Sequence, residues 1–216
     1  PIMSGLDFAK TVNANKQSQN GNGVTPPPFF SDHQLDSIAA LGFGVNWQDV
    51  IYRTAPLHNH TLSIAGGTDN TKYMVSGGYL DQQGIMLNSF YKRFTVRANL
   101  QTEITNWASF NVNWSAAKEQ GNAPSFGSAG DVAFNQKPAN SAPRWDPLQP
   151  IYNPDGTYHQ HDPAYGAYDV WNPLASAVEP KIDNNTITNN LFASLDFKIL
   201  EGLTLRISGG GSLGDV

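Results

Sequence analysis

The sequence predicts an all-β fold, an antiparallel up-and-down sheet that forms a segment of a transmembrane β-barrel and carries long external loops. Three observations predict this class. Six stretches alternate apolar and polar residues with a period of two, the pattern of strands with two different faces. The connections between these stretches alternate between short and long, as they do in membrane barrels. The 216-residue chain is also polar without being highly charged, because charged residues make up 14% and aromatic residues 11%.

Residues 1–57 are predicted to form an external loop with short helices. Apolar residues within 6–12 predict one short amphipathic turn, followed by a polar tract. A second short helix is expected over 32–41, with Ser31 or Asp32 as its N-cap and glycines at its end.

Residues 58–118 are predicted to hold four barrel strands, and residues 185–216 two more. Most of these strands are about ten residues long, close to the roughly 9 to 11 that a tilted strand needs to cross a bilayer. The apolar sides carry no charged residue at the level expected for the middle of the bilayer. In the clearest strand one side is apolar and the other polar or ionic, with Phe94, Val96, Ala98, Leu100 and Ile104 against Arg93, Thr95, Arg97, Asn99, Gln101 and Glu103.

The connections favour a membrane barrel over a soluble sandwich. Tight turns are expected at 69–70, 105–106 and 201–202, whereas the links at 81–90 and 119–184 are long. A membrane barrel has short turns on one rim and long loops on the other, while a sandwich usually has connections of more uniform length.

The long external loop at 119–184 is the candidate binding region. It is rich in proline and aromatic residues, and a connection of this length inside a compact fold is usually functional. Asn153 to Gly156 fits a type I turn. Flat amphipathic rings suit stacking on sugars or gripping peptide side chains, although they also suit a small core within the loop itself. The candidate substrate-binding residues are Trp145, Tyr152, Tyr158, Tyr165, Tyr168 and Trp171.

Composition argues against several other classes of function. The net charge is -5 and no basic run is present, so a nucleic-acid partner is not expected. The chain has no cysteine, which excludes disulfides and thiolate metal sites. It begins Pro-Ile-Met-Ser-Gly without an initiating methionine or a signal peptide, so we expect it to be a piece of a longer protein.

No motif predicts catalysis or a cofactor. The glycines at 209–214 match a phosphate-loop pattern and a nucleophile elbow, but both motifs need a following helix. His159 and His161, like His58 and His60, lack a third metal ligand at a recognisable spacing. We therefore expect no enzyme activity, no metal and no cofactor.

Several runs of residues occur together in the order and spacing of a known family. The run NWQDVIYRTAPLHNHTLSIAGG at 46–67 strongly resembles the SusC/RagA family of TonB-dependent outer-membrane transporters. The runs YMVSGGYLDQQG at 73–84 and KRFTVRANL at 92–100 resemble early barrel strands of that family. NPLA at 172–175 and LEGLT at 200–204 resemble later landmarks of the same stretch.

The resemblance implies an importer in the outer membrane of a Gram-negative bacterium, typically of the Bacteroidetes. Such a transporter has a 22-stranded barrel around a plug and a SusD-like surface lipoprotein as its partner. Its transport is driven through TonB. It takes up oligosaccharides or oligopeptides. This chain would hold the first external loop and about six early strands. It would contact outer-membrane lipid and the remainder of the barrel, while TonB would bind a part absent here.

Two other interpretations remain open at the level of sequence. A soluble secreted β-sandwich that binds glycans would account for the loop aromatics and the low charge. A β-rich glycosidase is the third alternative, although no carboxylate pair can be assigned to it. In the barrel interpretation, the candidates for interfacial aromatic belts are Tyr73, Tyr79, Phe94, Trp107 and Trp114.

Overall fold

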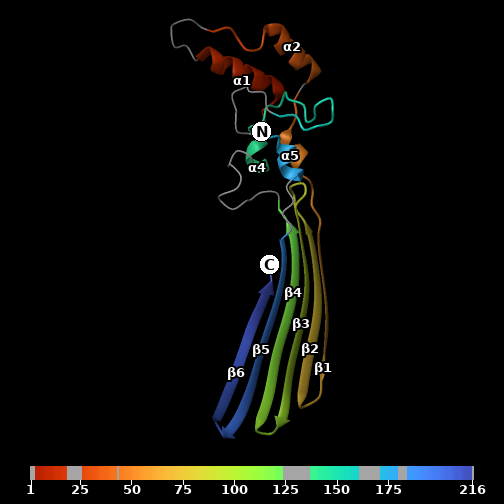
Figure 1. Cartoon of the computed structure of the whole chain (residues 1–216), viewed down its shortest axis with the longest axis vertical. Coiled ribbons are helices and arrows are strands. Elements are labelled where there is room, and N and C mark those ends of the chain that lie inside the picture. Colours follow the sequence, from red (N-terminus) through yellow and green to blue (C-terminus); the bar gives the residue numbers. More distant parts are fainter. Residues whose placement is uncertain are drawn as a thin grey trace. The chain divides into compact units, whose positions relative to one another are not determined.

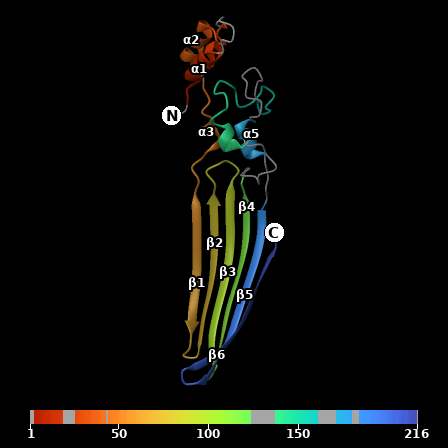
Figure 2. The ribbon, with the colours of Figure 1, turned by 90° about the vertical axis from the view of Figure 1, so that its left-hand side faces the viewer.

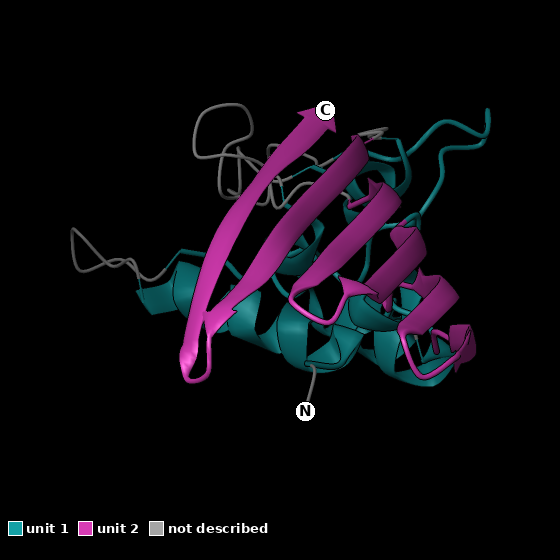
Figure 3. Cartoon of the chain, turned by 90° about the horizontal axis from the view of Figure 1, so that it is seen from below, with its two compact units in different colours: residues 1–53, 86–88, 124–181 teal, residues 54–85, 89–123, 182–216 magenta. Residues whose placement is uncertain are grey.

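The computed structural model divides the chain into two compact units (Figure 3). Unit 1 comprises residues 1–53, 86–88 and 124–181, and unit 2 comprises residues 54–85, 89–123 and 182–216. The residues that the structure describes are 3–18, 26–42, 44–123, 137–160, 171–179 and 184–215.

The described part of unit 2 is an antiparallel sheet of six strands in chain order, so the predicted all-β up-and-down fold is confirmed (Figures 1 and 2). Neighbours in the chain are also neighbours in the sheet. The strands are β1 (Leu57–Gly67), β2 (Thr71–Gln83), β3 (Phe90–Thr105), β4 (Ala108–Asn122), β5 (Asn184–Leu200) and β6 (Leu203–Asp215).

Five of the strands are longer than expected. The sequence predicts about ten residues each, but β2 to β6 have 13 to 17 residues. The alternation of apolar and polar residues fades before the pairing ends, because backbone hydrogen bonds continue where both faces are polar. As a result β4 reaches Asn122, beyond the expected boundary at residue 118.

The register of the strand pairs aligns residues in rows across the sheet. Five consecutive rows on one face carry mainly apolar, aromatic or glycine residues, and the charged residues among them, Lys118 and Asp215, lie only in the last row on the side of the long connections. Rows on one face lie about 6.7 Å apart along a strand, so five rows cover about 27 Å, comparable with the apolar band of outer-membrane barrels. The central row contains Ile64, Val75, Ala98, Trp114, Leu191 and Gly211.

Polar residues end this apolar band on the side of the long connections. Tyr79 and Phe94 are directly opposite each other in its last row. In the next row Asp81 faces Lys92, with Lys92 Nζ 3.8 Å from the Asp81 carboxylate. At the other end of the band Trp107 lies in a tight turn, and its ring stacks on another aromatic ring at 6.0 Å. Three of the five candidate belt residues therefore lie at the borders of the band.

The opposite face of the sheet carries the polar and charged side chains. Asp196 accepts hydrogen bonds from Arg206 Nη2 and from Asn111 Nδ2, both at 3.1 Å. Arg97 and Asn99 lie on the same face, two residues apart on β3. Next to the inner rows of the apolar band, the ionic groups therefore lie on the opposite side of the sheet, as the alternation predicts.

Two glycines in the sheet are covered by aromatic rings from neighbouring strands. Tyr73 is paired with Gly66, and a Cβ atom on Gly66 would lie only 2.6 Å from the Tyr73 hydroxyl. On the polar face Phe192 is paired with Gly210 and lies 3.1 Å from the corresponding position. These rings shield the backbone where a side chain is missing.

The described part of unit 1 consists of five helices and connecting loops. The helix predicted over 32–41 is confirmed, with Ser31 as its N-cap in a capping box with Gln34. The expectation of a single turn within 6–12 is wrong, because that helix continues to Ser18, into the polar tract, where Asn13 hydrogen-bonds both backbone groups of Phe30. The helices are α1 (Gly5–Ser18), α2 (Asp32–Leu41), α3 (Trp47–Ile51), α4 (Pro138–Ser141) and α5 (Pro173–Val178).

Described residues of unit 1 form two small hydrophobic cores. The tryptophan core contains Trp47, Ile51, Met86, Ala142, Trp145 and Ala177. The helical core contains Ala9, Phe30 and Ile38, with Leu148 packed against it. Among the described residues, no helix combines the length and the apolar character required to cross a membrane.

Gly202 tests the tight turn between β5 and β6. Its φ of 82° lies in the left-handed region that the second central residue of a type II turn requires. Gly202→Val should cost about 1–2 kcal/mol, whereas Gly202→Asn should cost less because asparagine tolerates this region. Urea titration of the intact protein in lipid vesicles measures the difference, and equal midpoints for the two variants would contradict the turn assignment.

Candidate functional site

Trp145, the first candidate binding residue, belongs to the tryptophan core. It is 3% exposed, and its ring meets the ring of Trp47 edge to face, with centroids 5.7 Å apart. Trp47 is 2% exposed and donates its indole N–H to the backbone carbonyl of Asp146 at 3.1 Å. Neither ring therefore presents a free flat face to solvent.

Tyr152 and Tyr158 lie side by side in a short hairpin. They form an isolated antiparallel bridge, and their ring centroids are 5.4 Å apart. Tyr152 is 50% exposed. Burial raises the pKa of Tyr158, and the neighbouring Tyr152 and Glu179 add to the rise. This pair is the one aromatic surface that the structure assembles from the described candidates.

The structure does not bring the other three candidate binding residues together with the tyrosine pair in the described part of the chain. Trp171 is 53% exposed and precedes α5. Tyr165 and Tyr168 lie outside the described residues. A shared aromatic platform of six rings therefore stays a prediction.

A tight turn closes the hairpin that carries the tyrosines. Gly156 N donates to the Asn153 carbonyl at 2.9 Å, as expected for a turn over these four residues. Asp155 accepts from the hydroxyl of Thr157 at 2.6 Å and from its backbone N–H at 3.0 Å. These bonds from Thr157, first from the hydroxyl and then from the backbone, lower the pKa of Asp155.

His159 is engaged by hydrogen bonds, as a structural histidine would be. Its ring nitrogens lie 2.7 Å from Asn153 Oδ1 and 2.7 Å from Gln149 Oε1. His58 and His60 stack in parallel with their centroids 6.5 Å apart. Within the described ranges, no group of three or more potential metal ligands comes together.

Asn172 connects the tyrosine hairpin to α5, and sequence analysis missed this role. Its side chain is fully buried and donates to the backbone carbonyls of Ile151 and His159 at 3.1 and 2.8 Å. Its Oδ1 accepts from the backbone N–H groups of Leu174 and Ala175, which caps α5. The sequence signal was an asparagine directly before a proline, the pattern of a helix N-terminus.

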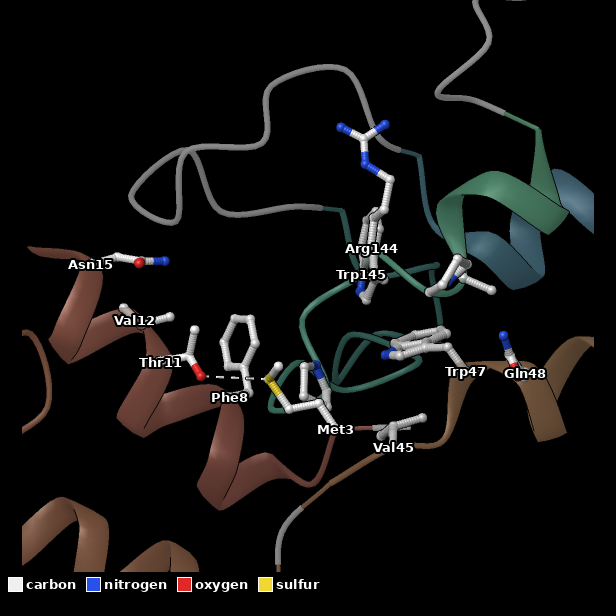
Figure 4. Close-up of a pocket in the computed structure, with 13 residues that line it drawn as sticks. Met3, Phe8, Thr11, Val12, Asn15, Val45, Trp47, Gln48, Arg144 and Trp145 are labelled. Carbon is white, nitrogen blue, oxygen red and sulfur yellow. Dashed lines mark hydrogen bonds between the residues drawn. The ribbon is translucent and has the colours of Figure 1, made fainter. Parts of the chain in front are cut away.

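A cavity of about 360 Å³ lies within unit 1 between α1 and the tryptophan core (Figure 4). Sequence analysis did not predict it, because α1 was expected to be a single turn. Its lining residues include Phe8, Thr11, Val12, Val45, Trp47 and Trp145.

A shallower depression of about 290 Å³ lies in unit 2. Arg97, Asn99, Asn113, Ser115 and Asn190 provide its polar wall. These residues belong to the polar face of β3, β4 and β5.

Comparison with known proteins identifies relatives of this chain. No family model matches it. A TonB-dependent receptor P3 of Formosa agariphila is 32% identical over 169 residues, which is 77% of this chain and 16% of that protein. The TonB-dependent receptor SusC of Bacteroides thetaiotaomicron is 31% identical over 190 residues, covering 77% of this chain and 18% of SusC.

Solved structures share the fold. The RagAB peptide importer in its open-open state matches 95% of this chain and 22% of its own chain, with a TM-score of 0.63 at 21% identity. Its closed-closed state matches 96% of this chain and 23% of its own, with a TM-score of 0.61 at 20% identity. This chain belongs to the SusC/RagA-like TonB-dependent transporters. It spans about a sixth of the length of the curated relatives it matches.

Asn172→Leu tests the connection in this SusC/RagA-like chain. It removes two donors and the helix cap from a buried position, and the expected loss of local stability is about 2–4 kcal/mol. Hydrogen exchange of the Leu174 and Ala175 amides should accelerate accordingly. Asn15→Leu, the same change at an exposed site on α1, serves as control, and equal protection in both variants would refute the role of Asn172.

Asp155 predicts a pH dependence of the hairpin turn. Because its pKa is lowered in the folded state, its contribution to stability is complete above the ordinary carboxyl pKa and is lost as the pH falls through the lowered value. The NMR shift of the Thr157 amide should therefore titrate with a midpoint below the ordinary aspartate value. Thr157→Val should move that midpoint upward, and an unchanged midpoint would disprove the assigned cause.

Proposed function

We propose that this chain is part of an importer in the outer membrane of a Gram-negative bacterium, driven through TonB. The observation that carries the proposal is the apolar band on one face of the six-stranded sheet, whose only charged residues lie in its border row. The large side chains of this band are exposed, with Leu62 at 71%, Ile64 at 62% and Leu213 at 77%. An apolar surface of this extent requires a partner.

Lipid is the partner that fits this face. The band is about as tall as the hydrocarbon layer that outer-membrane barrels cross, and its borders carry aromatic residues. A barrel strand satisfies its backbone groups by pairing with its neighbours, which a sheet of consecutive antiparallel strands does. We propose that the remainder of the same barrel pairs with β1 and β6.

The polar face would line a water-filled interior. Arg97 lies on it level with the central row of the band, where a bilayer would make a charge costly, and Asp196 and Arg206 lie at the end of the band near the tight turns. In a wide barrel such groups stay hydrated or contact the plug. Charged residues on this face are therefore compatible with strands that cross the membrane.

Substrates and partners follow from the relatives as proposals. SusC and the RagAB peptide importer both resemble this chain. We propose oligosaccharides or oligopeptides as cargo, a SusD-like surface lipoprotein as the partner at the external loops, and translocation rather than chemistry as the task. Trp145, Tyr152, Tyr158, Tyr165, Tyr168 and Trp171 remain the proposed contacts of the external loop with cargo.

The soluble sandwich alternative would need a second layer on the apolar face. In the described residues the six strands form one sheet, and that face stays open. No observation favours the glycosidase. The importer therefore accounts for the geometry better than either alternative.

Adjacent positions on β3 test which face meets lipid. Ala98 lies in the central row of the apolar band, and Asn99 points to the opposite face. Ala98→Arg should destabilise the assembled barrel by about 2–4 kcal/mol, while Asn99→Arg should have little effect. Urea titration of the intact protein in lipid vesicles provides the measurement. If Asn99→Arg proved the more damaging change, the assignment of the faces would be reversed.

Cell fractionation and uptake test the function itself. The intact protein should be recovered in the outer-membrane fraction, and its deletion should abolish TonB-dependent uptake of an oligosaccharide or oligopeptide. Recovery from the soluble periplasm would refute the proposal.

A further inference from the structure

The cavity in unit 1 separates the two hydrophobic cores. Phe8 and Val12 come from α1, which packs into the helical core, while Trp47 and Trp145 belong to the tryptophan core (Figure 4). Met3, Thr11 and Asn15 line the cavity and are exposed, so it is open to solvent. An open pocket of about 360 Å³ lined mainly by apolar groups has the form of a ligand site.

One face of α1 forms a continuous wall of the cavity. Phe8, Thr11, Val12 and Asn15 follow each other at helical spacings of three, one and three residues, which places them on one side of the helix. The hydroxyl of Thr11 already donates to the Asp7 carbonyl at 2.7 Å. The wall therefore presents mainly hydrocarbon to the cavity, and Asn15 adds an amide.

The opposite wall is mostly apolar and adaptable, although the charged side chain of Arg144 also lines the cavity (Figure 4). Val45, Trp47 and Trp145 line it, and Met3 contributes a flexible thioether from the chain before α1. Methionine fits ligands of different shapes because its side chain is unbranched and polarizable. The amide of Gln48 also lines the cavity. A mostly apolar pocket with a few polar groups is the usual form of a ligand site.

The tryptophans decide which kind of cargo fits. A sugar ring stacks on an exposed aromatic face, but Trp47 and Trp145 are 2% and 3% exposed and meet each other edge to face. The indole N–H of Trp47 is already bonded to Asp146. An apolar cavity of about 150 Å³ is enough to bind benzene, so this larger one accommodates a leucine or phenylalanine side chain.

We infer that this cavity is a binding site for an apolar side chain of an oligopeptide. The side chain enters between α1 and the two tryptophans, and the amides of Asn15 and Gln48 lie where they can bond the peptide backbone. The inference rests on the proposed import function and narrows its cargo to peptides with leucine-like or phenylalanine-like residues.

Calorimetry on the intact protein in detergent tests the inference. The probes are the tetrapeptides Gly-Leu-Gly-Gly and Gly-Ser-Gly-Gly, with maltotetraose as the sugar. We expect the leucine peptide to bind at least about tenfold more tightly than the serine peptide, because the cavity buries a side chain of that size. Equal affinities for the two peptides would overturn the inference.

Two phenylalanine substitutions on α1 test whether the preference for the leucine peptide arises in the cavity. Thr11→Phe fills the cavity from an exposed helix position and should abolish the preference for leucine. Gln17→Phe places the same ring on the other side of the helix, away from the cavity, and should preserve it. A preference that survives Thr11→Phe, or maltotetraose binding that Thr11→Phe weakens, would also overturn the inference.

The failure of this inference differs from the failure of the proposed function. An outer-membrane protein that imports cargo without any preference for leucine would refute only the cavity assignment. A periplasmic protein whose leucine preference depends on Thr11 would refute only the importer.

Discussion

The cross-strand register of the sheet is the constraint on which the rest of unit 2 depends. Side chains alternate along a strand, so a shift by one residue would bring Arg97 into the apolar band and move Ala98 to the polar face. The alignment of Ala98 with Val75 and Trp114 keeps the apolar rows continuous across three strands. This alignment determines on which face of the sheet each charged and each apolar side chain lies, and therefore which surroundings each face can meet.

The sequence predicts unit 2 well because its signal is local. Alternation, turn residues and the spacing of the connections are each visible within a few residues, and antiparallel neighbours in chain order need no long-range information. The strand ends are less predictable, since pairing continues to Asn122 after the alternation has faded. Backbone hydrogen bonds, which carry no side-chain signature, set these limits.

Unit 1 is less predictable because its contacts join distant parts of the chain. Trp47 bonds to Asp146, and Asn13 holds Phe30. From sequence, Trp145 was a candidate ligand contact, although a small core within the loop was the other interpretation; the fold buries it beside Trp47. The cavity depends on a helix that continues through polar residues, and neither its length nor its packing is visible in a local pattern.

The ring of Tyr73 across Gly66 has an evolutionary consequence. On the face that we propose to meet lipid, valine, leucine and isoleucine would exchange at little cost, because the acyl chains accommodate any of them. A glycine beneath a ring is exchanged less readily, since a methyl group there would have to displace the hydroxyl end of Tyr73. Across descendants of this chain, the residue with no side chain should then drift least, and the bulky neighbours that surround it should drift most.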